Sequence, residues 1–161
     1  MKKLYAFLFL LQILAASTTI HAQGIYQFWG ATPRGGNDDQ GLIFSTRSNG
    51  TGLTTQYLFE RKNPGGSPHA PFTAYNGKFY KVEKFGGLLD RGMIVEYDPV
   101  ANTTRNAASL ATLNGGIATG RLTLVGNKLY TLLARETGFW KGPAQLIEFD
   151  PATGALSSKY I

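Results

Sequence analysis

Three glycine loops contain the residues of this sequence that are best suited to bind a ligand. The first loop holds Asn37-Asp38-Asp39-Gln40, and carboxylate and amide oxygens are the ligands that calcium takes in sets of about six to eight. Asp38 and Asp39 are therefore candidate metal ligands. A structural turn is the competing interpretation, because Asp and Asn also bond nearby backbone N–H groups. Calcium is the only cofactor that the sequence suggests, and we expect that none is required.

Aromatic and basic residues occur in or beside the same loops. Aromatic rings stack on sugar rings, and Arg guanidinium groups hold carboxylates in pairs. If the loops emerge on one face, they form a surface for a glycan or a protein. The competing interpretation is that the aromatic rings fill space between neighbouring units. The candidate binding residues are Arg34, Phe85, Arg91, Phe139, Trp140 and Lys141.

The sequence contains no recognisable catalytic set. It has no Cys, and His69 is the single histidine after residue 22. Nucleophile elbows, phosphate loops and nucleotide fingerprints are also missing from the sequence. The glycine pairs lead into expected strands, whereas a phosphate loop opens a helix. We therefore assign no catalytic residue.

Residues 1–22 have the pattern of a secretory signal peptide. Lys2-Lys3 precede an apolar stretch over 4–16, which is shorter than the roughly 20 residues of a membrane span. Ile20-His21-Ala22 suits cleavage before Gln23, with an uncleaved anchor as the alternative. We expect a protein secreted to the extracellular space or cell surface, or to the periplasm, without a membrane span after cleavage.

The basic excess is small and scattered. Residues 1–22 carry two lysines and no acid, so their removal lowers the net charge from +6 to +4. No run of like charges marks a nucleic-acid surface, so we expect no nucleic-acid partner. A polysaccharide or a cell-surface protein is the expected partner, because weak attraction to an acidic polymer tolerates scattered charge.

The elements that must position these loops are short strands. The chain has 20 Gly and 7 Pro, and no apolar period of 3.6 residues follows the signal, so we expect an all-β fold with almost no helix. Asn76-Gly77 fits a two-residue type I′ hairpin, and Gly126-Asn127 marks a second hairpin. The expected strands are 24–32, 41–47, 53–59, 72–75, 78–84, 92–98, 103–108, 122–125, a strand beginning at 128–130, and 155–161.

The expected elements recur about every 51 residues. Gly36, Gly87 and Gly138 are spaced by 51, Lys78-Phe79-Tyr80 returns after 50 as Lys128-Leu129-Tyr130, and Glu96-Tyr97-Asp98-Pro99 returns after 52 as Glu148-Phe149-Asp150-Pro151. Four strands per unit with this period are typical of propeller blades or a related β-repeat array. We therefore expect one β-repeat domain over 23–161, a propeller-like array with antiparallel units near 24–60, 70–110 and 120–161.

This array is expected to be incomplete. The first unit lacks its front, and one small sheet cannot bury both its faces without neighbours on each side. Closed propellers usually have at least four blades. We expect the chain to be a fragment whose open edges are covered by missing repeats or by a partner chain.

The first unit contains four short motifs in a fixed order, Phe28-Trp29-Gly30-Ala31-Thr32, Gly35-Gly36, Gly41-Leu42-Ile43-Phe44 and Leu58-Phe59. With these motifs, the repeat resembles the GloVer-type tandem repeats of secreted bacterial proteins. Later units depart from the pattern, since Lys81 and Thr131 replace the Gly after Tyr. The resemblance implies a propeller-like array on an exported protein, often with a C-terminal sorting segment, and it implies no catalytic residues.

The sequence therefore predicts an exported recognition or surface-display module that binds a glycan or protein without catalysis. One alternative is a propeller hydrolase or lyase that uses a divalent cation in a central channel. Another is a structural spacer that binds nothing. A convergent cluster of carboxylates would favour the enzyme, and an aromatic surface would favour binding.

Overall fold

A computed structural model describes residues 27–60, 70–84, 87–113, 117–134 and 144–160 of the chain. These residues form three antiparallel sheets and two short 3-10 turns, η1 (Leu88–Asp90) and η2 (Leu110–Thr112). The prediction of an all-β fold is confirmed. No helix in these residues is long and apolar enough to cross a membrane.

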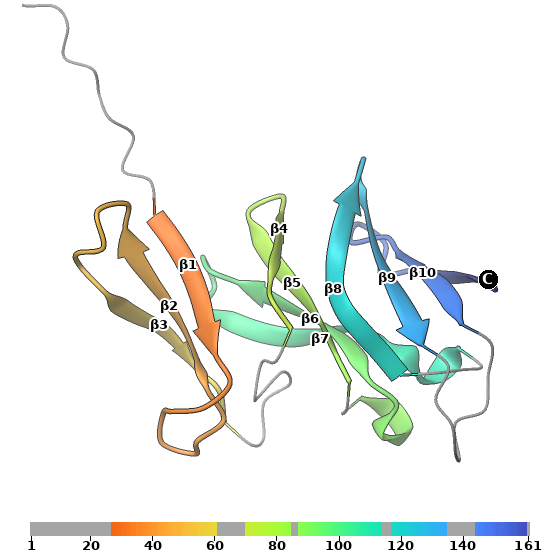
Figure 1. The fold of residues 1–161 in the computed structure, drawn as a ribbon, viewed down its shortest axis with the longest axis horizontal. Helices are drawn as coiled ribbons and strands as arrows, with labels where there is room; N and C mark the ends of the chain where they lie inside the picture. The colour runs from red at the N-terminus through yellow and green to blue at the C-terminus, as the bar shows by residue number, and fades with distance from the viewer. Residues whose placement is uncertain (1–26, 61–69, 85–86, 114–116, 135–143, 161) are drawn as a thin grey trace, which may run out of the picture.

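Each sheet is made of consecutive strands, and the three sheets follow one another from left to right in Figure 1. The first sheet contains β1 (Gln27–Thr32), β2 (Leu42–Arg47) and β3 (Thr54–Leu58). The second contains β4 (Thr73–Tyr75), β5 (Lys78–Glu83), β6 (Met93–Asp98) and β7 (Thr103–Ser109). The third contains β8 (Ile117–Val125), β9 (Lys128–Ala134), β10 (Gln145–Phe149) and β11 (Leu156–Tyr160). None of these sheets closes on itself, so the propeller arrangement stays a prediction.

Turn residues fix the register of the hairpins. Asn76 and Gly77 both have positive φ, 48° and 74°, as the type I′ turn between β4 and β5 requires. The two Asp-Pro turns also form as expected. Asp98 Oδ1 accepts bonds from the backbone N–H of Val100 and Ala101, and Asp150 Oδ1 accepts one from Ala152.

Strand β8 is longer than the sequence indicated. It begins at Ile117, whereas the expected strand began at Leu122, and its register shifts between Thr119 and Thr123. Gly120 lies within this bulge with φ of 95°, a conformation that a residue with a side chain rarely adopts. The bulge joins two short segments, each paired with β9, into one continuous strand.

Side chains alternate between the two faces of each sheet, so the buried residues form two separate cores. The core between the second and third sheets joins Val82 and Ile94 to Leu129, Ile147 and other buried residues. The core between the first and second sheets is smaller and more aromatic. Its buried members are Ile43, Phe59 and Tyr97, and half-buried aromatic side chains surround them.

Candidate functional site

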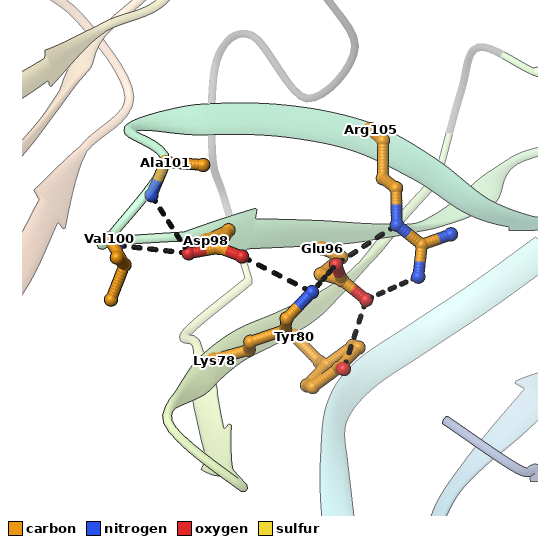
Figure 2. A network of polar contacts seen from close by, with 7 residues as sticks. All are labelled: Lys78, Tyr80, Glu96, Asp98, Val100, Ala101 and Arg105. Atoms are coloured by element: carbon orange, nitrogen blue, oxygen red, sulfur yellow. Dashed lines mark hydrogen bonds and ion pairs between the residues drawn. The ribbon is translucent and has the colours of Figure 1, made fainter. Parts of the chain in front are cut away.

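A buried carboxylate joins the three longer strands of the second sheet (Figure 2). Glu96 on β6 accepts bonds from Lys78 Nζ at 2.6 Å, from Tyr80 OH at 3.0 Å, and from Arg105 Nε at 2.9 Å. Burial alone would raise the Glu96 pKa, but the bonds from Arg105, Lys78 and Tyr80 outweigh it and hold this pKa below its usual value. Burial and the bond to Glu96 raise the Tyr80 pKa. The group is a charged clamp across β5, β6 and β7.

The third sheet repeats the Lys and Tyr part of this arrangement, with Ser157 opposite Glu148 where Arg105 stands opposite Glu96. Glu148 accepts bonds from Lys128 Nζ at 2.5 Å and from Tyr130 OH at 2.8 Å. The bond from Lys128 is the main cause that lowers the Glu148 pKa. Because both sheets use this network to tie neighbouring strands, its role is structural, and its donors already have partners within the chain.

The best candidate binding site is a pocket of about 450 Å³ between the first and second sheets. It extends from Trp29 on β1 to Pro33 just after this strand, and along the chain from Ala70 to Ala74. Aromatic rings supply much of its lining. The full lining is Trp29, Gly30, Ala31, Pro33, Ile43, Ala70, Pro71, Phe72, Ala74, Phe79 and Tyr97. This lining suits an apolar or aromatic group.

The aromatic rings of the pocket hold one another in place. The ring centres of Trp29 and Phe79 lie 5.1 Å apart, and Trp29 and Tyr97 lie 6.3 Å apart. Tyr97 is buried and donates from its OH to Asn102 Oδ1 at 3.1 Å. Burial raises the pKa of Tyr97, so it remains a neutral phenol at neutral pH. The aromatic part of the pocket wall is therefore uncharged at neutral pH.

The pocket lies beside the first sheet, which has one strand fewer than the other two sheets in the described part of the chain. In the next interface, β8 packs on both β4 and β5. By the same arrangement, β4 would pack on β1 and on a fourth strand of the first sheet. In the described part of the chain, that sheet has three strands. The β1 and β4 residues at this position line the pocket instead.

Two of the predicted site residues interact within the first glycine loop. Asp39, with φ of 52°, accepts a bond from the backbone N–H of Gly35 at 2.8 Å. An exposed ion pair of 3.8 Å joins Arg34 to Asp39. Asp38 belongs to the same loop. Among the described residues, no group of three or more His, Cys, Asp or Glu side chains could hold a metal ion. Calcium binding by Asp38 and Asp39 stays a prediction.

The proposed aromatic and basic surface is described only in part. The β1–β2 loop with Arg34 and the β5–β6 loop with Arg91 lie at the same end of the sheets (Figure 1). The remaining predicted binding residues, Phe85, Phe139, Trp140 and Lys141, lie outside the described residues, as does His69. Whether these loops form one surface stays a prediction.

Sequence reasoning did not single out the pocket residues. In the sequence, Trp29, Phe72 and Phe79 stand in expected strands or repeat motifs, and Tyr97 stands in a repeated turn motif, but none of them is a candidate binding residue. The incomplete front of the first unit was the available signal, because a missing strand leaves a space beside its neighbour. The sequence alone did not show which side chains would face that space.

Comparisons of this chain with protein-family models, curated proteins and solved structures gave no match. The resemblance to GloVer-type repeats therefore stays a sequence-based prediction.

Proposed function

We propose that this chain is an exported, non-catalytic recognition module that binds an extended segment of another polypeptide in the pocket beside β1. The observation that carries the proposal is the position of the pocket along an open strand edge. Among the described strands, β5 and β9 each pair on both sides, whereas β1 pairs only with β2. The outer backbone groups of β1 are thus placed to pair with an added strand.

The pocket lining favours a polypeptide over a glycan. Prolines, alanines and aromatic rings predominate, and the one buried phenol of the lining bonds Asn102. Sugar recognition needs several polar groups to orient the hydroxyls. In an added strand, alternate side chains would enter the pocket and the backbone would pair with β1. Apolar or aromatic side chains at alternate positions are therefore the expected specificity.

Selection from short random peptides displayed on phage tests this function. We expect enrichment of sequences with apolar residues at alternate positions. Ala74 is exposed and lines the pocket, so Ala74→Trp fills the pocket from its rim. This variant should weaken binding of a selected peptide by at least about tenfold. Ala152→Trp, an exposed change in the turn after β10, is the matched control and should bind normally.

Backbone methylation of the selected peptide tests how the peptide binds. An added strand donates alternate N–H groups to β1, so N-methyl groups in one register should abolish binding and those in the other should be tolerated. Equal binding by Ala74→Trp and wild type would overturn the pocket assignment. Equal effects of the two methylation registers would overturn strand addition.

A further inference from the structure

The sheets stack in a constant direction. The first and second sheets each have one face that packs onto the next sheet along the chain. This face, and the equivalent face of the third sheet, is here called the trailing face, and the opposite face of each sheet is called the leading face. The trailing face of the second sheet carries Val82 and Ile94, which pack in one core with Leu129 and Phe149 on the leading face of the third sheet. In the same way, the trailing face of the first sheet packs on the leading face of the second, with Tyr57 OH bonded to Thr104 Oγ1 at 3.0 Å.

The trailing face of the third sheet repeats the trailing face of the second. In the second sheet, Tyr80 pairs with Glu96 and Val82 pairs with Ile94. In the third sheet, the corresponding pairs across β9 and β10 are Tyr130 with Glu148 and Leu132 with Leu146. Each Tyr bonds its Glu, which also binds a Lys from the start of the same strand as the Tyr. The two faces therefore match at the apolar pair and at the Lys, Tyr and Glu positions, and they differ where Ser157 replaces Arg105.

The two faces differ in what covers them. Val82 is 3% exposed and Ile94 is fully buried, because the third sheet covers them. Leu132 is 47% exposed and Leu146 is 37% exposed. This leucine pair lies in the middle of a sheet face beside Glu148, whose side chain is 32% exposed, whereas the side chain of its counterpart Glu96 is 3% exposed. Such a face has the composition of an interface core. This face is thus built like one that another sheet covers.

The chain also carries an open leading face. On the first sheet, the register places Phe28, Phe44, Leu42 and Leu58 on the side away from the second sheet. Phe28 is 60% exposed, and Leu58 is 38% exposed. Phe44 lies against Gly30, where an added Cβ would come within 2.5 Å of its ring, so the ring covers the glycine and widens the apolar surface. Both ends of the array therefore present apolar sheet faces.

We propose that copies of this chain associate head to tail, with the trailing face of the third sheet of one copy packed on the leading face of the first sheet of the next. This contact continues the trailing-to-leading packing that occurs twice within the chain. Its two surfaces differ, so the contact is heterologous and can extend to rings or open filaments. The peptide pocket lies inside the chain between the first two sheets, so the association is independent of the proposed function.

Sedimentation velocity over a range of protein concentrations tests the association. The wild-type chain should form species larger than a monomer as its concentration rises. Leu132→Glu with Leu146→Glu blocks the trailing face, and Phe28→Glu blocks the leading face. Each variant should bind its own copies at least about a hundredfold more weakly, because the contact would bury an unpaired carboxylate. Val100→Glu, at a 94% exposed turn position, is the control and should behave as wild type.

Mixing the two blocked variants distinguishes head-to-tail from symmetric association. The Phe28→Glu protein keeps its trailing face and the double variant keeps its leading face, so the mixture should form one-to-one dimers that grow no further. All substituted positions are exposed, and circular dichroism checks that each variant folds. A wild-type chain that stays monomeric at every concentration, or a mixture without dimers, would overturn the proposal.

Discussion

Lys81 is a charged residue placed in an aromatic environment. Its side chain is fully buried between the first two sheets, and its Nζ lies 4.9 Å from the ring centre of Phe59 and 5.3 Å from that of Phe72. It forms an ion pair with Glu83, two residues along the same face of β5. Burial lowers the Lys81 pKa to about 8, against the opposing effect of Glu83. The ammonium group is therefore less favourable in the folded protein than in the unfolded chain.

This environment predicts that stability rises between about pH 8 and pH 9.5. In that window the unfolded chain keeps the Lys81 proton, whose pKa there is near 10.5, while the folded protein releases it. The free energy of unfolding should increase by about 1–2 kcal/mol across the window. Urea unfolding at a series of pH values measures this change. Lys81→Met should remove the rise, and an equal rise in that variant would assign it to another group.

The raised pKa values of the tyrosines set the upper limit of this window. Tyr80 and Tyr97 have pKa values above 10 because they are buried, so they favour the folded state while the unfolded chain still has neutral phenols. Their contribution is lost as the pH rises above about 10. Measurements below that pH therefore report mainly on Lys81.

The hairpins and turns could be predicted because they depend on residues that are adjacent in sequence. The contacts between sheets could not be predicted in this way. Asn76-Gly77 and Asp98-Pro99 specify their turns through residues adjacent in sequence, and both formed as expected. Lys81 was placed in a strand, but its burial depends on Phe59 and Phe72, which come from other strands of the fold. The pocket was missed for the same reason, because its walls meet only after two sheets pack. Period and turn signals define strands, but they do not define which faces meet.

The two hairpin turns differ in which positions need positive φ. Asn76 and Gly77 both have it, whereas at the β8–β9 turn only Gly126 does, with φ of 62°, as in a type II′ turn. Gly126→Ala should therefore lower the free energy of unfolding by about 1–2 kcal/mol. No atom lies within 4 Å of the added Cβ, so the loss reports backbone conformation alone.

Asn127→Ala is the matched control at the second position of this turn. Since this position lacks positive φ and its side chain is exposed, the change should cost less than about 0.5 kcal/mol. Urea unfolding compares the two variants directly. If both substitutions lower the free energy of unfolding equally, the turn does not have the type II′ requirement for positive φ at its first position alone.

The two interfaces of the molecule differ in the amount of apolar surface that they bury. Between the second and third sheets, ten buried residues of the described part of the chain form one continuous core. Thr73 Oγ1 also donates to the Leu122 carbonyl at 2.5 Å. Between the first and second sheets, three buried residues and several half-buried aromatics among the described residues form a core that borders the pocket. Because stability follows buried apolar area, the first sheet is held less strongly than the other two.

This difference predicts that the first sheet detaches before the rest of the molecule unfolds. Trp29 lies in that interface, and Trp140 is the only other tryptophan of the chain, so Trp140→Phe leaves one local fluorophore. In urea, the Trp29 fluorescence transition should precede the loss of β-sheet circular dichroism. Hydrogen exchange should give β1–β3 opening free energies at least about 2 kcal/mol below those of β5, β6, β9 and β10. Coincident transitions would instead make the three sheets one cooperative unit. Separate transitions would mean that the pocket wall carrying Trp29 can move while the second and third sheets stay folded, which would open the space beside β1 to a ligand.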